Sequence, residues 1–152
     1  MESGMANLRE TPIEISKAEF QEIGNKLIES ISNFLDTIKE KPVTYAASSE
    51  QLKDILGQIS LPEEGANSLD LLSGTTDLLF NHSLFNGHPK FLGYITSSAA
   101  PIGALADLLA SSVNPNVGAQ ILSPVATEIE IQTIQWLAEF IGVSKGYGGS
   151  RL

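Results

Sequence analysis

Four hydroxyl side chains lie close together in the middle of the chain, at Tyr94, Thr96, Ser97 and Ser98. Glycine and apolar residues flank them, and this mixture suits the wall of a small-molecule pocket, where a few polar groups orient a ligand on an apolar surface. The alternative is a polar turn between two elements. Composition alone leaves both interpretations open, so the segment is a candidate for ligand contact.

The two imidazoles of the chain, His82 and His88, do not have the spacing of metal ligands. Neither is paired with a carboxylate at helical ligand spacing, and the HExxH pattern of zinc enzymes does not occur, so we expect no metal site. His88 precedes Pro89. In that position a histidine most often bonds to backbone within a loop, although it could also line a pocket.

Other patterns that would predict catalysis do not occur in the sequence. No serine lies in a GxSxG pattern, and there is neither a GxGxxG pattern nor a P-loop. Glu128 and Glu130 are two residues apart, so they point to different faces of a helix. We expect them to compensate the positive end of a helix dipole rather than to form an acid–base pair.

A long stretch without cations follows Lys90. Up to Lys145 the sequence contains no lysine or arginine, and the only charges are those of Asp107, Glu128, Glu130 and Glu139. A solvated helix normally carries a charged face, so we expect other protein to cover this stretch. The turn from Asn114 to Gly118 lies inside it, and is either a plain connector or a loop offered to a partner subunit.

The elements that must position these residues are expected to be helical. Ser16 predicts an N-cap, with Glu19 completing a capping box, and Asn67 or Ser68, and later Ser123, are further candidate caps. Pro101 and Pro124 fit the first turns of two later helices, and Gly142 is a candidate C′ residue. The apolar stripe of the first helix is expected at Phe20, Ile23, Leu27, Ile28, Ile31, Phe34, Leu35 and Ile38. Residues 91–95 are expected to be short and extended or irregular. The expected helices span about 17–39, 49–57, 68–79, 101–113 and 124–141. The prediction is therefore a mainly α-helical chain with little strand.

Composition restricts the partners and the compartment. The chain has 152 residues and a formal net charge of −9, which disfavours nucleic acid and anionic membrane surfaces as partners. It has no cysteine, so disulfides and thiolate metal sites are excluded, as suits a reducing compartment. The N-terminus has no apolar signal region, and the weakly polar run 99–113 is too short to span a bilayer. We expect a cytoplasmic protein.

The sequence divides into four parts by pattern. Residues 1–15 are expected to be loose, residues 16–87 to form a helical segment, and residues 88–145 to form a pocket wall and partner contacts. Residues 146–152 are rich in glycine and end abruptly, which suggests a piece of a longer protein. A flexible tail is the alternative.

The order of these motifs resembles that of the pyridoxal-phosphate-dependent amino-acid decarboxylases, in the aromatic-amino-acid and glutamate decarboxylase group. The matching pieces, in order, are His88–Phe91, Gly93–Ser97, Ala106–Leu109, Asn114–Gly118, Ser123–Glu130 and Trp136–Leu137. Order and spacing agree without an obvious gap over roughly 69–149, and the first helix matches loosely. Several motifs in register are more specific than one short pattern.

The resemblance implies the N-terminal helical segment of a fold-type I α/β enzyme. Enzymes of that group are obligate homodimers, in which both subunits contribute to each active site. By this resemblance Tyr94 and Ile95 would contact the substrate side chain, and Thr96 and Ser97 would complete that wall of the pocket, with Ser97 as a polar contact. The loop Asn116, Val117 and Gly118 would reach into the active site of the partner.

The resemblance also implies the cofactor and the reaction. Pyridoxal 5'-phosphate would act as the electron sink when the α-carboxylate of an amino acid leaves as carbon dioxide. The family's phosphate-binding segment, stacking histidine, aspartate and Schiff-base lysine would all follow Gly149, so we expect no catalytic or cofactor-anchoring residue in these 152 residues. Aromatic-specific members carry bulkier groups at the positions of Ile95 and Gly118, so the substrate amino acid stays open.

Two other hypotheses are compatible with the same residues. One is a stand-alone helical module that dimerises through its apolar helices. The other is a related lyase of the same fold that cleaves another bond of an amino-acid-like substrate.

Overall fold

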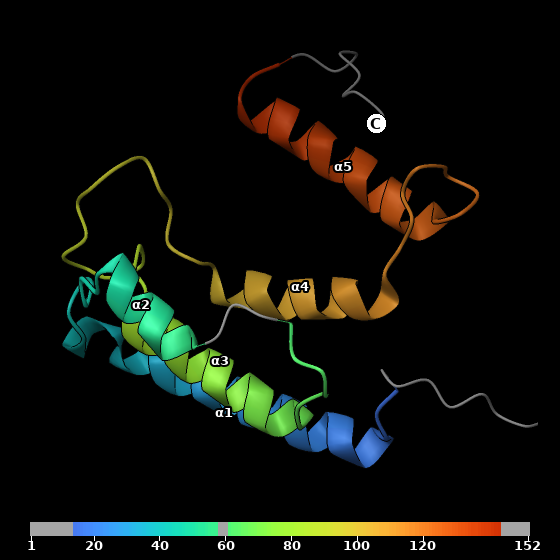
Figure 1. Ribbon diagram of the computed structural model, residues 1–152. Helices are drawn as coiled ribbons and strands as arrows, with labels where there is room; N and C mark the ends of the chain where they lie inside the picture. Colours follow the sequence, from blue (N-terminus) through green and yellow to red (C-terminus); the bar gives the residue numbers. More distant parts are fainter. Residues whose placement is uncertain (1–13, 58–60, 144–152) are drawn as a thin grey trace, which may run out of the picture. The chain divides into compact units, whose positions relative to one another are not determined.

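The computed structural model describes residues 14–57 and 61–143. In these ranges the chain forms five α-helices and one short 3-10 helix (Figure 1). They are α1 (Lys17–Thr37), η1 (Ile38–Glu40), α2 (Ser49–Leu56), α3 (Ser68–His82), α4 (Pro101–Val113) and α5 (Pro124–Phe140). The β pairing described in them is one isolated antiparallel bridge between Thr44 and Leu84. The mainly α-helical prediction is confirmed for this part of the chain.

The chain divides between Ser98 and Ala99 into two compact units, and each is considered by itself. The first unit holds α1, η1, α2 and α3, and the second holds α4 and α5. Of the expected end segments, the glycine-rich residues 146–152 lie outside the described residues, as do residues 1–13 of the expected loose N-terminus.

Side-chain caps fix the starts of the helices in the first unit. The Ser16 hydroxyl accepts a hydrogen bond from the backbone N–H of Glu19, at 3.1 Å. Only this half of the expected capping box is described at α1. The full box forms at α2 instead, where Ser48 and Gln51 each accept a bond from the backbone N–H of the other.

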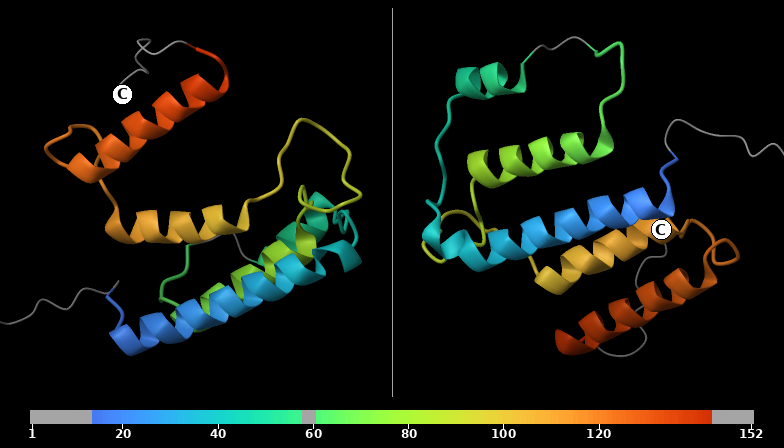
Figure 2. Two further views of the ribbon diagram at one scale, coloured as in Figure 1. Left: turned by 180° about the vertical axis from the view of Figure 1, so that it is seen from behind. Right: turned by 90° about the horizontal axis from the view of Figure 1, so that it is seen from below.

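The apolar stripe of α1 packs against α3, and the two helices lie side by side (Figures 1 and 2). Two residues expected in the stripe, Phe20 and Ile28, are exposed. The half-buried members of the stripe are Ile23, Leu27, Ile31, Phe34, Leu35 and Ile38. This contact partly buries the apolar face of the long helix α1 within the first unit.

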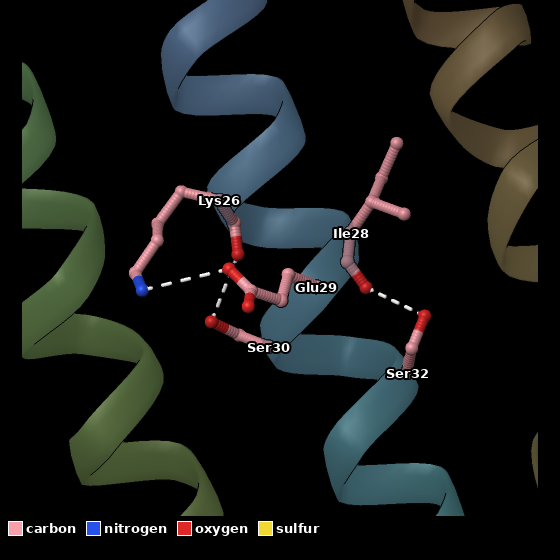
Figure 3. Close-up of polar contacts among 5 residues, drawn as sticks. All are labelled: Lys26, Ile28, Glu29, Ser30 and Ser32. Carbon is pink, nitrogen blue, oxygen red and sulfur yellow. Dashed lines mark hydrogen bonds and ion pairs between the residues drawn. The ribbon is translucent and has the colours of Figure 1, made fainter.

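Polar side chains in the middle of α1 bond within the helix (Figure 3). The hydroxyls of Ser30 and Ser32 donate to the carbonyls of Lys26 and Ile28, at 2.9 and 2.8 Å. Lys26 and Glu29 form an ion pair at 3.7 Å, with both side chains more than half exposed. An exposed pair of this kind stabilises a protein by little, so the apolar stripe positions α1.

α3 is longer than the sequence predicts and ends at His82 rather than near Leu79. Its start is capped by Asn67, as expected. The additional residues are held by long-range contacts. Phe80 stacks on Phe34 with ring centroids 4.2 Å apart, and the Lys41 ammonium donates to the Phe80 carbonyl at 3.4 Å. Tertiary packing therefore extends the helix beyond its local signal.

Phe85 is the centre of the aromatic cluster in the first unit. Its ring lies edge-on to Phe34, at 5.2 Å, and to Tyr45, at 6.3 Å. Phe85 is 5% exposed, and it is the only apolar residue of the described ranges that is buried. Its backbone N–H donates to the Val43 carbonyl at 2.9 Å. The segment after α3 is thereby joined to the segment after η1.

The second unit begins with α4, whose apolar side chains are exposed. Pro101 occupies the first turn as predicted, and Asn114 ends the helix in the left-handed region, with φ 46°. The exposed apolar residues of α4 are Ile102, Leu105, Leu108, Leu109 and Val113. Within the described residues of this unit, α4 and α5 do not pack on each other. No helix in the described ranges is long and apolar enough to cross a membrane.

The start of α5 has the expected cap residue and proline, but the cap lacks a side-chain bond. Ser123 precedes Pro124, but its side chain makes no capping bond, because its ψ of 69° differs from the extended values at the three working caps. Its carbonyl instead accepts bonds from the backbone N–H and the hydroxyl of Thr127, at 3.0 and 2.8 Å. Gly142, with φ 80°, follows the helix as predicted for a C′ residue.

We expect replacement of Phe85 by alanine to destabilise the first unit by about 3 kcal/mol, because it leaves a cavity among aromatic rings. The measurement is urea unfolding followed by the NMR amide signals of α1 and α3. Phe140→Ala is the control, since Phe140 is 88% exposed and lies in the second unit. Equal effects of the two replacements would contradict the central place of Phe85.

Candidate functional site

The candidate pocket wall lies on an irregular segment between α3 and α4. Phe91 is half-buried at its start, and the residues that follow are exposed. Tyr94 is 89% exposed, and Ile95 is fully exposed. Thr96 and Ser97 are exposed as well. The four predicted residues are consecutive, and all of them lie on the open surface of the described first unit.

The backbone at Tyr94 has an unusual conformation. Its φ is 58°, in the left-handed region that non-glycine residues rarely adopt. The Tyr94 ring lies 6.5 Å from that of Phe91, centroid to centroid, and tilted by 30°. A left-handed tyrosine in an exposed segment carries local strain, and strained residues are concentrated at sites that bind ligands.

His88 holds the start of this segment from inside the first unit. The residue is 4% exposed, and both of its ring nitrogens lie within hydrogen-bond distance of backbone groups. Nδ1 accepts from the backbone N–H of Lys90 at 3.0 Å, and Nε2 lies 2.9 Å from the Lys41 carbonyl. The interpretation of His88 as a loop histidine that bonds to backbone is confirmed.

The predicted partner loop lies in the second unit and is held by its own hydrogen bonds. The Asn116 side chain accepts from the backbone N–H of Gly118 at 3.0 Å. The Gln120 amide donates to the Glu128 carboxylate at 2.7 Å. Val117, which lies between Asn116 and Gly118, is exposed. The loop therefore has a defined conformation within its own unit.

The bond from Gln120 to Glu128 was missed by sequence reasoning. Glu128 lies beyond the first turn of α5, which holds no acidic residue, so the expected compensation of the helix dipole is not supported. Its carboxylate instead fastens the preceding loop. The eight-residue separation carries no local signal, because the bond depends on how the loop folds back. Glu130 is exposed, and the structure gives no acid–base pairing of the two carboxylates.

The described lysines do not fit the anchor of a pyridoxal phosphate group. A Schiff-base lysine must lose its proton, which requires a desolvated site. All described lysines are exposed except Lys41, which is half-buried. The Lys41 ammonium already donates to the Phe80 carbonyl. Within the described ranges there is also no group of three or more acidic or histidine side chains that could hold a metal ion.

Comparison with known proteins identifies the family. Residues 49–150 match the pyridoxal-dependent decarboxylase conserved domain. An aromatic-L-amino-acid decarboxylase of Bacillus atrophaeus is 31% identical over 130 residues, which are 86% of this chain and 27% of that protein. The matched range is more than half of the chain and includes both candidate segments. The chain belongs to the pyridoxal-dependent decarboxylase family.

Solved structures share the fold. The crystal structure of Oryza sativa TDC with PLP and tryptamine has a TM-score of 0.78 and 20% identity, over 93% of this chain and 28% of that one. Catharanthus roseus tryptophan decarboxylase in complex with L-tryptophan has a TM-score of 0.76 and 18% identity, over 93% of this chain and 30% of that one. The chain therefore spans little more than a quarter of the length of these proteins.

We expect Tyr94→Gly to be more stable than Tyr94→Ala by about 1 kcal/mol, because glycine adopts the left-handed region without a Cβ clash. Both replacements remove the same exposed ring, so their difference isolates the backbone. The measurement is urea unfolding of the first unit by NMR. Equal stability of the two variants would show that Tyr94 is not held at positive φ.

Proposed function

We propose that this chain is the N-terminal part of a pyridoxal-phosphate-dependent amino-acid decarboxylase, which releases the α-carboxylate of its substrate as carbon dioxide. The observation that carries the proposal is the family match over residues 49–150, which contains both candidate segments. Pyridoxal phosphate, when bound by the intact enzyme, supplies the electron sink for the bond cleavage. The residues that anchor it are proposed to lie outside this chain.

The part of this chain in that reaction is to bind and orient the substrate. Tyr94 and Ile95 are proposed to contact the substrate side chain, and Thr96 and Ser97 to contribute the polar side of the wall. Support comes from the consecutive exposed positions of these residues and from the left-handed backbone at Tyr94. Holding a substrate in one orientation lowers the entropic part of the barrier before any bond is cleaved.

The proposed substrate is an L-amino acid with a large apolar side chain. Tyr94 and Ile95 offer a broad apolar surface, whereas this strip carries no charged side chain for a polar substrate. The relatives reported above are an aromatic-L-amino-acid decarboxylase and a tryptophan decarboxylase, so aromatic amino acids are the first to test.

The proposed assembly is a homodimer. The exposed apolar residues of α4, and those of α5 such as Val125, Ile129 and Phe140, are typical of surfaces that a permanent interface covers. We propose that the loop Asn116, Val117 and Gly118 contributes to the active site of the partner subunit. A cytoplasmic location stays a prediction, which suits the absence of cysteine from the sequence.

We expect the chain alone to release no carbon dioxide from L-tryptophan or L-tyrosine, and to retain no pyridoxal phosphate after gel filtration. A chimera in which this chain replaces the matched segment of the relative that is 31% identical should form a dimer. That dimer should retain pyridoxal phosphate and release carbon dioxide. Carbon dioxide release, cofactor absorbance and light scattering are the measurements.

The control is the same relative with the matched segment deleted. Cofactor retained by the chain alone would contradict the proposal that its anchors lie elsewhere. A chimera that folds as a dimer and binds the cofactor, yet releases no carbon dioxide from any amino acid tested, would contradict the proposed role in decarboxylation.

A further inference from the structure

His88 is a buried polar residue to which the proposed reaction gives no role. It is 4% exposed, and four hydrogen bonds involve its ring and backbone. Its ring contacts the backbone of Lys41 and Lys90, its N–H donates to the Phe85 carbonyl at 3.0 Å, and its carbonyl accepts from Phe91 at 2.9 Å. One residue thus connects the segment after η1 with the start of the Tyr94 segment.

These partners determine the tautomer of the imidazole. The backbone N–H of Lys90 is a donor, so Nδ1 must be the acceptor and carry no proton. The Lys41 carbonyl is an acceptor, so Nε2 must carry the proton and donate it. The neutral ring with its proton on Nε2 satisfies both bonds, and each nitrogen then has a separate task.

The Nδ1 bond is local, and the Nε2 bond is long-range. Nδ1 reaches only two residues along the chain and shapes the turn from His88 to Lys90. Nε2 reaches Lys41, which is 47 residues away in sequence and directly follows η1. Nδ1 therefore shapes the turn, and Nε2 attaches the turn to the backbone that follows η1.

We propose that His88 is a positioning residue, whose Nε2 docks residues 88–97 onto the chain after η1 while its Nδ1 shapes the turn that leads to Tyr94. The description of residues 94–97 as a pocket wall rests on the proposed function, whereas the hydrogen bonds do not. Loss of the Nε2 bond releases residues 88–97 from the chain after η1. Loss of the Nδ1 bond loosens only the turn from His88 to Lys90.

Two replacements separate the two tasks. In His88→Asn, the side-chain oxygen lies as many bonds from the backbone as Nδ1 and can still accept from Lys90, but the side chain is too short to reach Lys41. In His88→Gln, the amide nitrogen lies as many bonds away as Nε2 and can still donate to Lys41, but no acceptor stands in place of Nδ1. Each variant keeps one bond and loses the other.

The readout is amide hydrogen exchange of the 152-residue chain by NMR. In His88→Gln the Lys90 amide should exchange about tenfold faster than in the wild type, while the Phe85 amide, bonded to Val43, keeps its protection. In His88→Asn the Phe85 amide should exchange about tenfold faster, and the Lys90 amide should be preserved. The heteronuclear NOE of residues 91–97 should fall in His88→Asn only.

The matched controls are His82→Asn and His82→Gln, at the half-buried histidine that ends α3, and they should leave both amides unchanged. The crossed pattern supports the proposal. Equal acceleration of both amides in both His88 variants, or no change in either, overturns it. Unprotected Lys90 and Phe85 amides in the wild-type chain also overturn it. The pattern is measured without substrate, so failure of the decarboxylase assay bears on the proposed function alone.

Discussion

The junction between residues 41–45 and residues 80–91 is the constraint on which the first unit depends. Phe85 fills its apolar centre against Phe34 and Tyr45, and its backbone bonds to Val43. His88 adds polar contacts to this junction, because its buried ring bonds to the backbone of Lys41 and of Lys90. Apolar packing and satisfied polar groups therefore meet within a few residues, immediately before the candidate pocket wall.

The second unit has no comparable centre within its described residues. Its helices carry exposed apolar side chains, and its loop is held by short-range bonds such as the one from Asn116 to Gly118. Most helical stability in proteins comes from the packing of an apolar face, and the described residues of this unit show no packing between α4 and α5. The chain spans about a quarter of the length of its relative. The exposed apolar helices are the physical reason for the proposal that further protein covers them.

Much of the helical structure was predictable, because the signals are local. The proline at position 101, the Asn67 cap and the glycine at 142 all lie where the sequence predicts them. The end of α3 was predicted too early, because distant packing extends the helix. Ser123 does occupy the N-cap position of α5, but its side chain makes no capping bond there. The grouping of Tyr94 with Ser97 followed from adjacency, but the docking of His88 onto Lys41 carries no signal in spacing or composition.

The most direct test of this account is the tautomer of His88, read from the nitrogen-15 chemical shifts of its ring in the wild-type chain. The account predicts one protonated nitrogen, Nε2, and one unprotonated acceptor, Nδ1, without averaging between them. Equal, averaged shifts for the two nitrogens, as in a free imidazole, would show that His88 does not hold the segment. A proton on Nδ1 would contradict the account as well, because the bond from Lys90 could not form.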